Sequence, residues 1–151
     1  MNYRGVSRIA LAVLTSGLLA CGGGQSFPAA AQARDDVPPE IASRENPVEL
    51  TSDKVRYYTR QFKGKCSRCH GIDGRGAGPE AATQSKPPRD LTDRAYMRTR
   101  TDGQLFYQIL VGGVERSSMP AFGPESAQGW TEEKVWYLVA FVRRFSELPE
   151  E

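Results

Sequence analysis

Residues 66–70 read Cys66-Ser67-Arg68-Cys69-His70, and they hold the only histidine and two of the three cysteines of this 151-residue chain. On a helical turn, residues i and i+3 face the same side, so the two thiols are presented together. The histidine directly follows the second thiol. This C-x-x-C-H spacing is the signature for covalent attachment of a c-type haem.

Haem attachment gives each residue of the motif a role. The thiols of Cys66 and Cys69 each add to one vinyl group, and His70 binds the iron as its proximal ligand. A structural zinc site needs four Cys or His ligands, and a four-cysteine iron–sulfur site needs more cysteines than the chain has. A thioredoxin-like C-x-x-C expects a βαβ setting, which the sequence does not indicate. We therefore predict one covalent haem c with its iron.

From about residue 51 onward, apolar periodicity predicts a small all-α domain, residues 51–151, with about three main helices. They run over about 51–64, 101–111 and 131–145, and each starts at a threonine suited to N-capping. The connecting stretches, 71–100 and 112–130, are rich in Gly and Pro. Loops this long are unusual in a compact domain unless something organises them. A large apolar cofactor would do so.

Residues 51–146 resemble a class I, monohaem c-type cytochrome. Three stretches carry the resemblance: C-S-R-C-H-G at 66–71, S-M-P-A-F at 118–122, and W-x-x-x-x-V-W-Y-L-V-A-F-V-R at 130–143. The resemblance implies an all-α fold wrapped round one haem. Its first and last helices would cross, which would bring Tyr58 or Phe62 near Phe141.

Met119 is the predicted distal ligand of the iron. It lies in a proline-containing loop after a helix, 49 residues past His70, and the Met-Pro pair matches the distal ligand of the family. Thioether sulfur is the usual partner of histidine in electron-transfer cytochromes. Met97 lies among charged residues, and the ordinary role of a methionine is to fill a core.

Two further residues are candidates for haem binding. By resemblance, the Pro79 carbonyl would accept the Nδ1–H of His70 and so raise the basicity of the ring; the alternative is ordinary turn chemistry. Arg89 is expected either to pair with a haem propionate or to be a simple exposed arginine.

The N-terminus resembles a bacterial lipoprotein signal peptide. Residues 1–8 carry two arginines and no acid, and residues 9–20 form an uncharged apolar stretch too short to span a bilayer. This signal peptide, residues 1–20, ends Leu18-Leu19-Ala20-Cys21, which predicts lipidation at Cys21. Ala31-Gln32-Ala33 offers a rival cleavage site. Residues 21–50 show no period and are expected to be a flexible tether.

The distribution of charge along the chain indicates which binding partners are plausible. Without the signal segment, 18 basic and 18 acidic residues remain, which argues against nucleic-acid binding by bulk charge. A basic run over residues 54–75 brackets the C-x-x-C-H motif; it is either a solvated face or a docking surface for an acidic redox partner. Its cations are Lys54, Arg56, Arg60, Lys63, Lys65, Arg68 and Arg75.

These features predict a single-electron carrier, not an enzyme, that is exported and lipid-anchored on the periplasmic or outer side of a bacterial membrane. Its partners would be a quinol-oxidising complex, an oxidase or a dehydrogenase. The alternative is a haem-based ligand sensor or peroxidase-like enzyme with an open sixth iron position. A fixed subunit of a respiratory complex would show the same chemistry as a free carrier.

Overall fold

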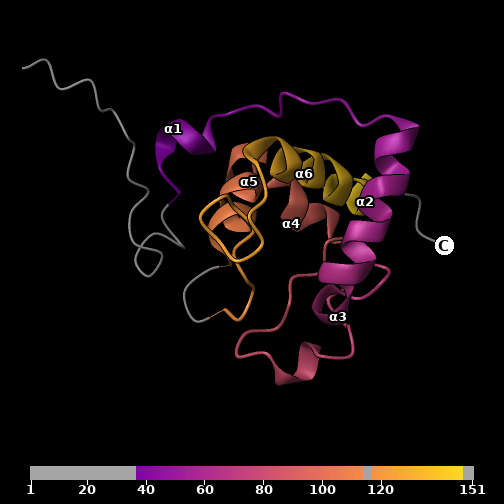
Figure 1. Ribbon diagram of the computed structural model, residues 1–151. Helices are drawn as coiled ribbons and strands as arrows, with labels where there is room; N and C mark the ends of the chain where they lie inside the picture. Colours follow the sequence, from indigo (N-terminus) through magenta and orange to yellow (C-terminus); the bar gives the residue numbers. More distant parts are fainter. Residues whose placement is uncertain (1–36, 114–116, 148–151) are drawn as a thin grey trace, which may run out of the picture.

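A computed structural model describes residues 37–113 and 117–147. These residues form helices joined by loops, with no strand among them, so the predicted all-α fold is confirmed. None of the helices in these ranges is long and apolar enough to cross a membrane. In chain order they are α1 (Pro39–Ala42), α2 (Ser52–Lys65), α3 (Ser67–His70), the 3-10 turn η1 (Ala81–Thr83), α4 (Arg94–Arg98), α5 (Asp102–Val111) and α6 (Glu132–Glu147) (Figure 1).

Helices α2 and α6 pack against each other, as the resemblance implied. The Thr51 side chain caps α2 by accepting a hydrogen bond from the Lys54 amide. One face of α2 is then buried through Tyr58 and Phe62. The Phe62 ring lies 5.8 Å from that of Phe141 on α6, centroid to centroid. The expected contact between the two helices is confirmed.

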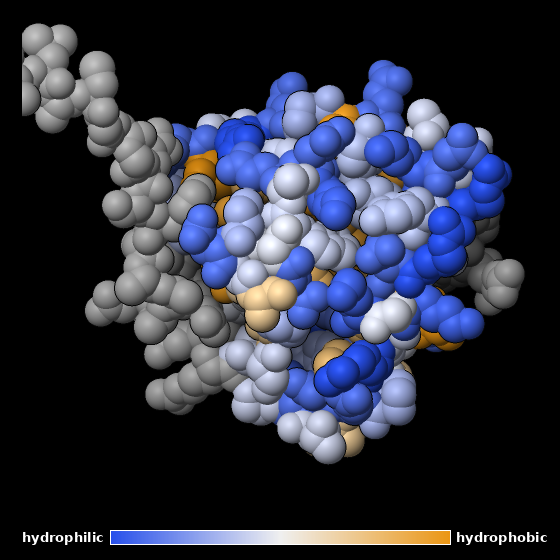
Figure 2. Space-filling view, viewed as in Figure 1, coloured by the Kyte–Doolittle hydropathy of each residue, from blue (hydrophilic) through white to orange (hydrophobic). Residues whose placement is uncertain are grey.

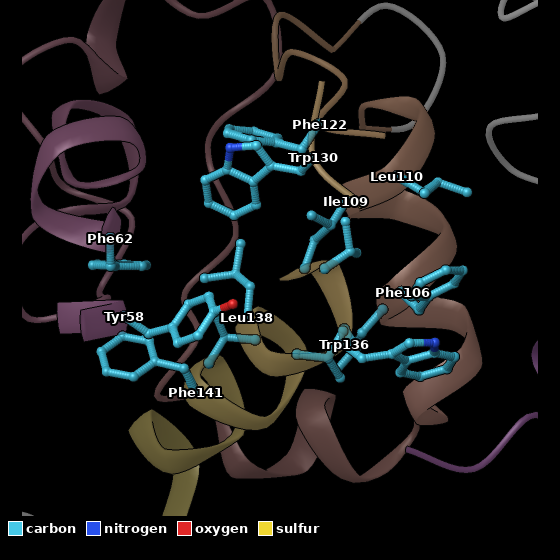
Figure 3. Close-up of a cluster of buried hydrophobic side chains, with 14 of the residues drawn as sticks. Tyr58, Phe62, Phe106, Ile109, Leu110, Phe122, Trp130, Trp136, Leu138 and Phe141 are labelled. Carbon is cyan, nitrogen blue, oxygen red and sulfur yellow. The ribbon is translucent and has the colours of Figure 1, made fainter. Parts of the chain in front are cut away.

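Helix α5 forms the other main contact of α6. Its N-terminus carries a capping box in which the side chains and backbone amides of Thr101 and Gln104 pair reciprocally. Phe106 stacks on Trp136 of α6 with ring centroids 4.1 Å apart (Figure 3). Gly112 ends the helix at φ 88°, a conformation that favours glycine. The helices predicted over residues 101–111 and 131–145 thus pack against each other in the core.

Residues 71–100, expected to be one long loop, contain η1 and α4. Met97 of α4 is 1% exposed and belongs to the core. Arg143 of α6 holds α4 and α5 in place, because its guanidinium donates to Asp102 Oδ1 at 2.8 Å and to the Met97 carbonyl at 2.5 Å. A five-residue helix that depends on such contacts has too little periodicity to be recognised from sequence.

Residues 37–50, which we call the N-terminal strap, lie against the helical domain. Ile41, Val48 and Leu50 pack on its core. Asn46 Nδ2 donates to the Trp136 carbonyl at 3.1 Å, and the strap crosses the molecule before entering α2 (Figure 1). The prediction of a flexible tether is therefore wrong for residues 37–50, because their apolar side chains follow no period yet find separate places on the core. Residues 21–36 of that tether lie outside the described residues.

The strap covers the Phe106–Trp136 stack. The Arg44 guanidinium lies 5.0 Å from the centre of the Phe106 ring and 5.1 Å from that of Trp136, and it also pairs with Glu132 at 3.2 Å. Such a cation over aromatic rings is favourable by about 0.5–1 kcal/mol at exposed sites. The strap therefore belongs to the folded domain.

Gly103 sets how closely α1 approaches α5, since a Cβ at this position would collide with the carbonyl oxygen of Ile41. We expect Gly103→Ala to lower the free energy of unfolding by about 1–3 kcal/mol, because the strap must shift. Gly64→Ala is the matched control, because a Cβ there meets nothing within 4 Å. It should raise stability by up to about 1 kcal/mol through helix propensity. Chemical denaturation of both variants checks this; an equal gain at Gly103 would show that the strap does not press on α5.

Candidate functional site

The C-x-x-C-H motif lies on α3, directly after α2. The backbone bends at Cys66, whose amide still donates to Phe62 at 2.9 Å while its carbonyl accepts from the amides of Cys69 and His70 at 3.1 and 2.9 Å. Both cysteines and the histidine are therefore on one helical turn. The two thiols are free and half-buried. This is the arrangement that the spacing predicted.

The loop after His70 caps the C-terminal end of α3. Three of its amides donate to α3 carbonyls: Gly76 to His70 at 2.7 Å, Gly78 to Cys69 at 3.0 Å, and Glu80 to Arg68 at 2.7 Å. A Cβ at Gly78 would lie 2.5 Å from the Arg68 carbonyl oxygen, so only glycine permits this approach. The Arg68–Glu80 ion pair, at 2.8 Å, closes the same contact through side chains. The loop thereby fixes the turn that carries the motif.

A pocket opens beside α3. Its empty volume, open mouth included, is about 830 Å³. Its surface is mostly apolar. The residues that line it come from three parts of the chain: Lys65, Cys66, Cys69 and His70; then Gln84, Lys86, Pro88, Arg89 and Tyr96; and then Gln108, Gly113, Ser117, Met119, Pro120 and Phe122.

His70 is oriented by a backbone carbonyl. Its Nδ1 lies 3.0 Å from the carbonyl oxygen of Arg89, which accepts a hydrogen bond and leaves Nε2 without a proton. Burial lowers the pKa of His70, and the hydrogen bond to Arg89 partly opposes this shift. The ring is therefore neutral near pH 7, the form that binds a metal.

The prediction that Pro79 supplies this acceptor is wrong. The amides of Gly78 and Glu80, on either side of Pro79, point back to α3, so this part of the loop lies against the α3 backbone. The chain reaches the His70 ring only at Arg89, 19 residues after the histidine. No local pattern in the sequence marks that return.

The thiol of Cys66 is largely shielded from solvent. Burial raises the pKa of Cys66 to about 12, although the neighbouring Lys65 acts in the opposite direction. Before a thioether forms, the thiol therefore stays protonated at neutral pH. Because the thiolate is the reactive form, this lowers the reactivity of the free thiol. The residue is sheltered within the pocket wall.

Met119 lines the same pocket as the motif, and Met97 does not. Met119 is half-buried, and its amide donates to Ser117 Oγ at 3.1 Å. Close packing of Gly112 and Gly113 positions its loop: a Cβ at Gly112 would lie 2.9 Å from the Met119 carbonyl oxygen. Met97 is enclosed in the core on α4. The pocket therefore brings together His70 and the methionine that the sequence favoured.

The pocket contains a further residue that the sequence proposed, Arg89, and several that it did not. Arg89 was a candidate, and it lines the pocket with its guanidinium 4.2 Å from the centre of the Tyr96 ring. Tyr96, Lys86 and Gln108 line it as well. The only sequence signal for Tyr96 is an aromatic residue within a short charged segment, which does not point to a site. Cys21 lies outside the described residues.

Comparison with known families shows to which family the chain belongs. The cytochrome c family model matches residues 59–146. This chain belongs to the cytochrome c family. Cytochromes of this family hold haem c covalently, with its iron, and use it in electron transfer, so the predicted cofactor is confirmed. No curated protein matches the sequence.

A solved structure shares the fold of this cytochrome. It is a chain of the reducing HAO-like protein complex Kustc0457/Kustc0458 of Kuenenia stuttgartiensis. The two chains are 23% identical with a TM-score of 0.53, and the match covers 66% of this chain. It spans 46% of the Kuenenia chain. At 23% identity the likeness concerns the fold alone.

The pocket fits a haem c by the chemistry of its donors. Two thiols on one turn suit two thioether bonds, and a neutral imidazole with a free Nε2 suits an axial position. A thioether from a separate segment lines the same mostly apolar space. Cations at the same pocket, Lys65, Lys86 and Arg89, suit the two carboxylates of a haem.

Proposed function

We propose that this cytochrome is a single-electron carrier with one haem whose axial ligands are His70 and Met119. One observation carries the proposal: both side chains line one pocket although 49 residues separate them. The single C-x-x-C-H motif supports one haem per chain.

The residues suit electron transfer better than reaction at the iron. A haem supplies an iron that takes up and releases one electron. His70 is held by the Arg89 carbonyl, so its ring need not reorient on oxidation. Met119 would fill the sixth position, leaving no place for a substrate, and as a weak donor it would raise the potential. We therefore propose a carrier and not an enzyme; ready binding of carbon monoxide by the unmodified protein would instead indicate a sensor or a peroxidase-like enzyme.

We also propose that Arg89 pairs with a haem propionate. The Cζ atom of its guanidinium lies 4.2 Å from the centre of the Tyr96 ring, and a cation–π contact does not use the N–H donors. Arg89 lines the pocket, and it forms no ion pair within the described residues. A bidentate arginine–carboxylate pair would fix the orientation of the cofactor.

A second part of the proposal is that acidic redox partners dock at the pocket mouth. Three arginines of the basic run form ion pairs that neutralise their charge. The pairs are Arg56 with Asp53, Arg68 with Glu80, and Arg75 with Asp73. Lys65 of the same run and Lys86, which lies outside the run, are exposed and line the pocket. The face shown in Figure 2 is mainly hydrophilic with small hydrophobic areas. Such partners include a quinol-oxidising complex, an oxidase or a dehydrogenase.

Reversal of the charges at the pocket mouth tests this docking surface. We expect Lys65→Glu with Lys86→Glu to slow electron exchange with an acidic redox protein by roughly tenfold at low ionic strength, because electrostatic steering is lost. High salt should remove the difference. The matched control is Arg98→Glu with Lys134→Glu, which changes the net charge equally at exposed residues outside the pocket. Equal slowing in both variants would contradict a localised docking surface.

We propose that the protein is exported and held at a membrane by lipid on Cys21. The support is the sequence Leu18-Leu19-Ala20-Cys21 after an apolar stretch. The strap would then leave a tether of residues 21–36 between the lipid and the domain.

Mass spectrometry of the N-terminus of the protein from its native membrane tests the anchor. We expect an N-terminal Cys21 that carries acyl chains, since several chains give firm attachment where one is marginal. Cys21→Ser should release the protein from the membrane fraction. An N-terminus at Arg34 would contradict the proposal and favour cleavage after Ala33.

A further inference from the structure

Tyr96 lies between the haem pocket and two arginines. Its ring contacts the guanidinium of Arg89, with Cζ 4.2 Å from the ring centre, and that of Arg100, with Cζ 4.9 Å away. The ring is half-buried, packs on the core and lines the pocket. It is therefore well placed to hold both cations.

Arg89 connects this ring to His70. Its carbonyl oxygen accepts the hydrogen bond from His70 Nδ1 at 3.0 Å, while its guanidinium lies on Tyr96. The backbone of Arg89 thus contacts the proximal histidine, and its side chain contacts α4. Whatever fixes the Arg89 side chain also limits the movement of its carbonyl.

The backbone beyond Arg89 is held by separate contacts. The Leu91 amide donates to the Gly74 carbonyl at 2.7 Å, and Asp90 Oδ1 accepts from the Thr92 amide at 2.8 Å. Neither contact involves the Arg89 side chain. Within the described residues, the contact that holds that side chain is the one with Tyr96.

Arg100 is fixed on the other side. Its carbonyl accepts a hydrogen bond from Arg143, which ties it to α6. Its Nε is buried and has no hydrogen-bond partner among the described residues. The ring contact with Tyr96 is therefore a main contact of this guanidinium. Through Arg143 and Arg100, the position of Tyr96 is linked to the core.

We propose that Tyr96 is a positioning residue for the proximal ligand: by holding the Arg89 guanidinium, it keeps the Arg89 carbonyl on His70 Nδ1. The inference rests on His70 being the iron ligand of the proposed function. A hydrogen bond to this nitrogen fixes the ring and raises its basicity as a ligand. Tyr96 would thereby act on the haem without binding it.

Proton exchange at His70 Nδ1 in the reduced holoprotein tests the proposal. His70 is the only histidine, so ¹⁵N-histidine labelling gives one ring spin system to follow by NMR. We expect Tyr96→Leu to speed exchange of the Nδ1 proton by roughly two- to fivefold, the factor that corresponds to a cation–π contact at this exposure. Tyr96→Phe keeps the ring and should match the unmodified protein.

Two further variants separate positioning from general stability. Met97 lies next to Tyr96 on α4, and Met97→Ala weakens the core. Among the ring contacts and hydrogen bonds of the described residues, Met97 makes none with Arg89. The Met97→Ala variant should leave exchange unchanged at temperatures well below unfolding. Arg89→Met should speed exchange at least as much as Tyr96→Leu does, because it also removes the proposed propionate pair. The double variant should match Arg89→Met, because the ring then has no guanidinium to hold.

The proposal is overturned if Tyr96→Leu leaves exchange unchanged, if Met97→Ala speeds it equally, or if the effects of Tyr96→Leu and Arg89→Met add in full. The same spectrum distinguishes failure of the proposed function. A protonated Nε2 in the unmodified holoprotein would contradict His70 as an iron ligand, whatever the effect at Tyr96.

Discussion

Replacement of Met119 by alanine is expected to open the iron to external ligands. If the thioether fills the sixth position, the unmodified protein is six-coordinate and low-spin in both oxidation states. Met119→Ala should then bind carbon monoxide when reduced and azide when oxidised. Its oxidised spectrum should lose the weak charge-transfer band near the red edge of the visible range, and its potential should fall, because a weak donor that favours Fe(II) has gone.

Met97→Ala is the matched control for this result, since it removes the same side chain from the core. Met97 is 1% exposed and packs in the hydrophobic cluster. Its truncation should lower the free energy of unfolding by about 2–5 kcal/mol through lost packing. The charge-transfer band should persist and carbon monoxide should not bind.

Opposite spectra would reverse the assignment of the distal ligand. Loss of the band in Met97→Ala, with its retention in Met119→Ala, would contradict Met119. Rapid binding of carbon monoxide by the unmodified protein would contradict the carrier itself and indicate an open sixth position. Absorption spectra with and without carbon monoxide separate these cases.

The second large effect is expected at the attachment cysteines. Cys66→Ala with Cys69→Ala should abolish covalent haem, so that haem staining of a denaturing gel is lost. Each single variant should keep one thioether and hence some stain. The haem would supply an apolar contact for the loops that line this mostly apolar pocket. We therefore expect the double variant to have a clearly lower melting temperature as well.

Ser67→Ala is a control within the same turn. Its hydroxyl donates to the Lys63 carbonyl at 2.7 Å, and Ser67 does not line the pocket. Covalent haem should be retained in full. Haem that is extracted from the unmodified protein by acidified acetone would show that no thioether exists.

Sequence periodicity was sufficient for the elements that stabilise themselves. Helices α2, α5 and α6 are each directly preceded by a threonine and bury one regular face, as for Tyr58 and Phe62 on α2. Helix α4 and the strap lack such a pattern. Their positions depend on contacts with residues far along the chain, such as that of Asn46 with Trp136. Local propensity does not encode contacts of this kind.

The sequence by itself determined the covalent chemistry of this cytochrome, because the cysteines and His70 act within one helical turn and their spacing carries the information. Resemblance added Met119, and the structure supports it by placing Met97 in the core and Met119 at the pocket. Only the tertiary structure decided which carbonyl orients His70. A hydrogen-bond acceptor is defined by position and not by residue type, since every residue has a carbonyl. The chain folds the Arg89 carbonyl back onto the His70 ring and turns Pro79 away. The position of Tyr96 beside Arg89 likewise follows from the tertiary structure.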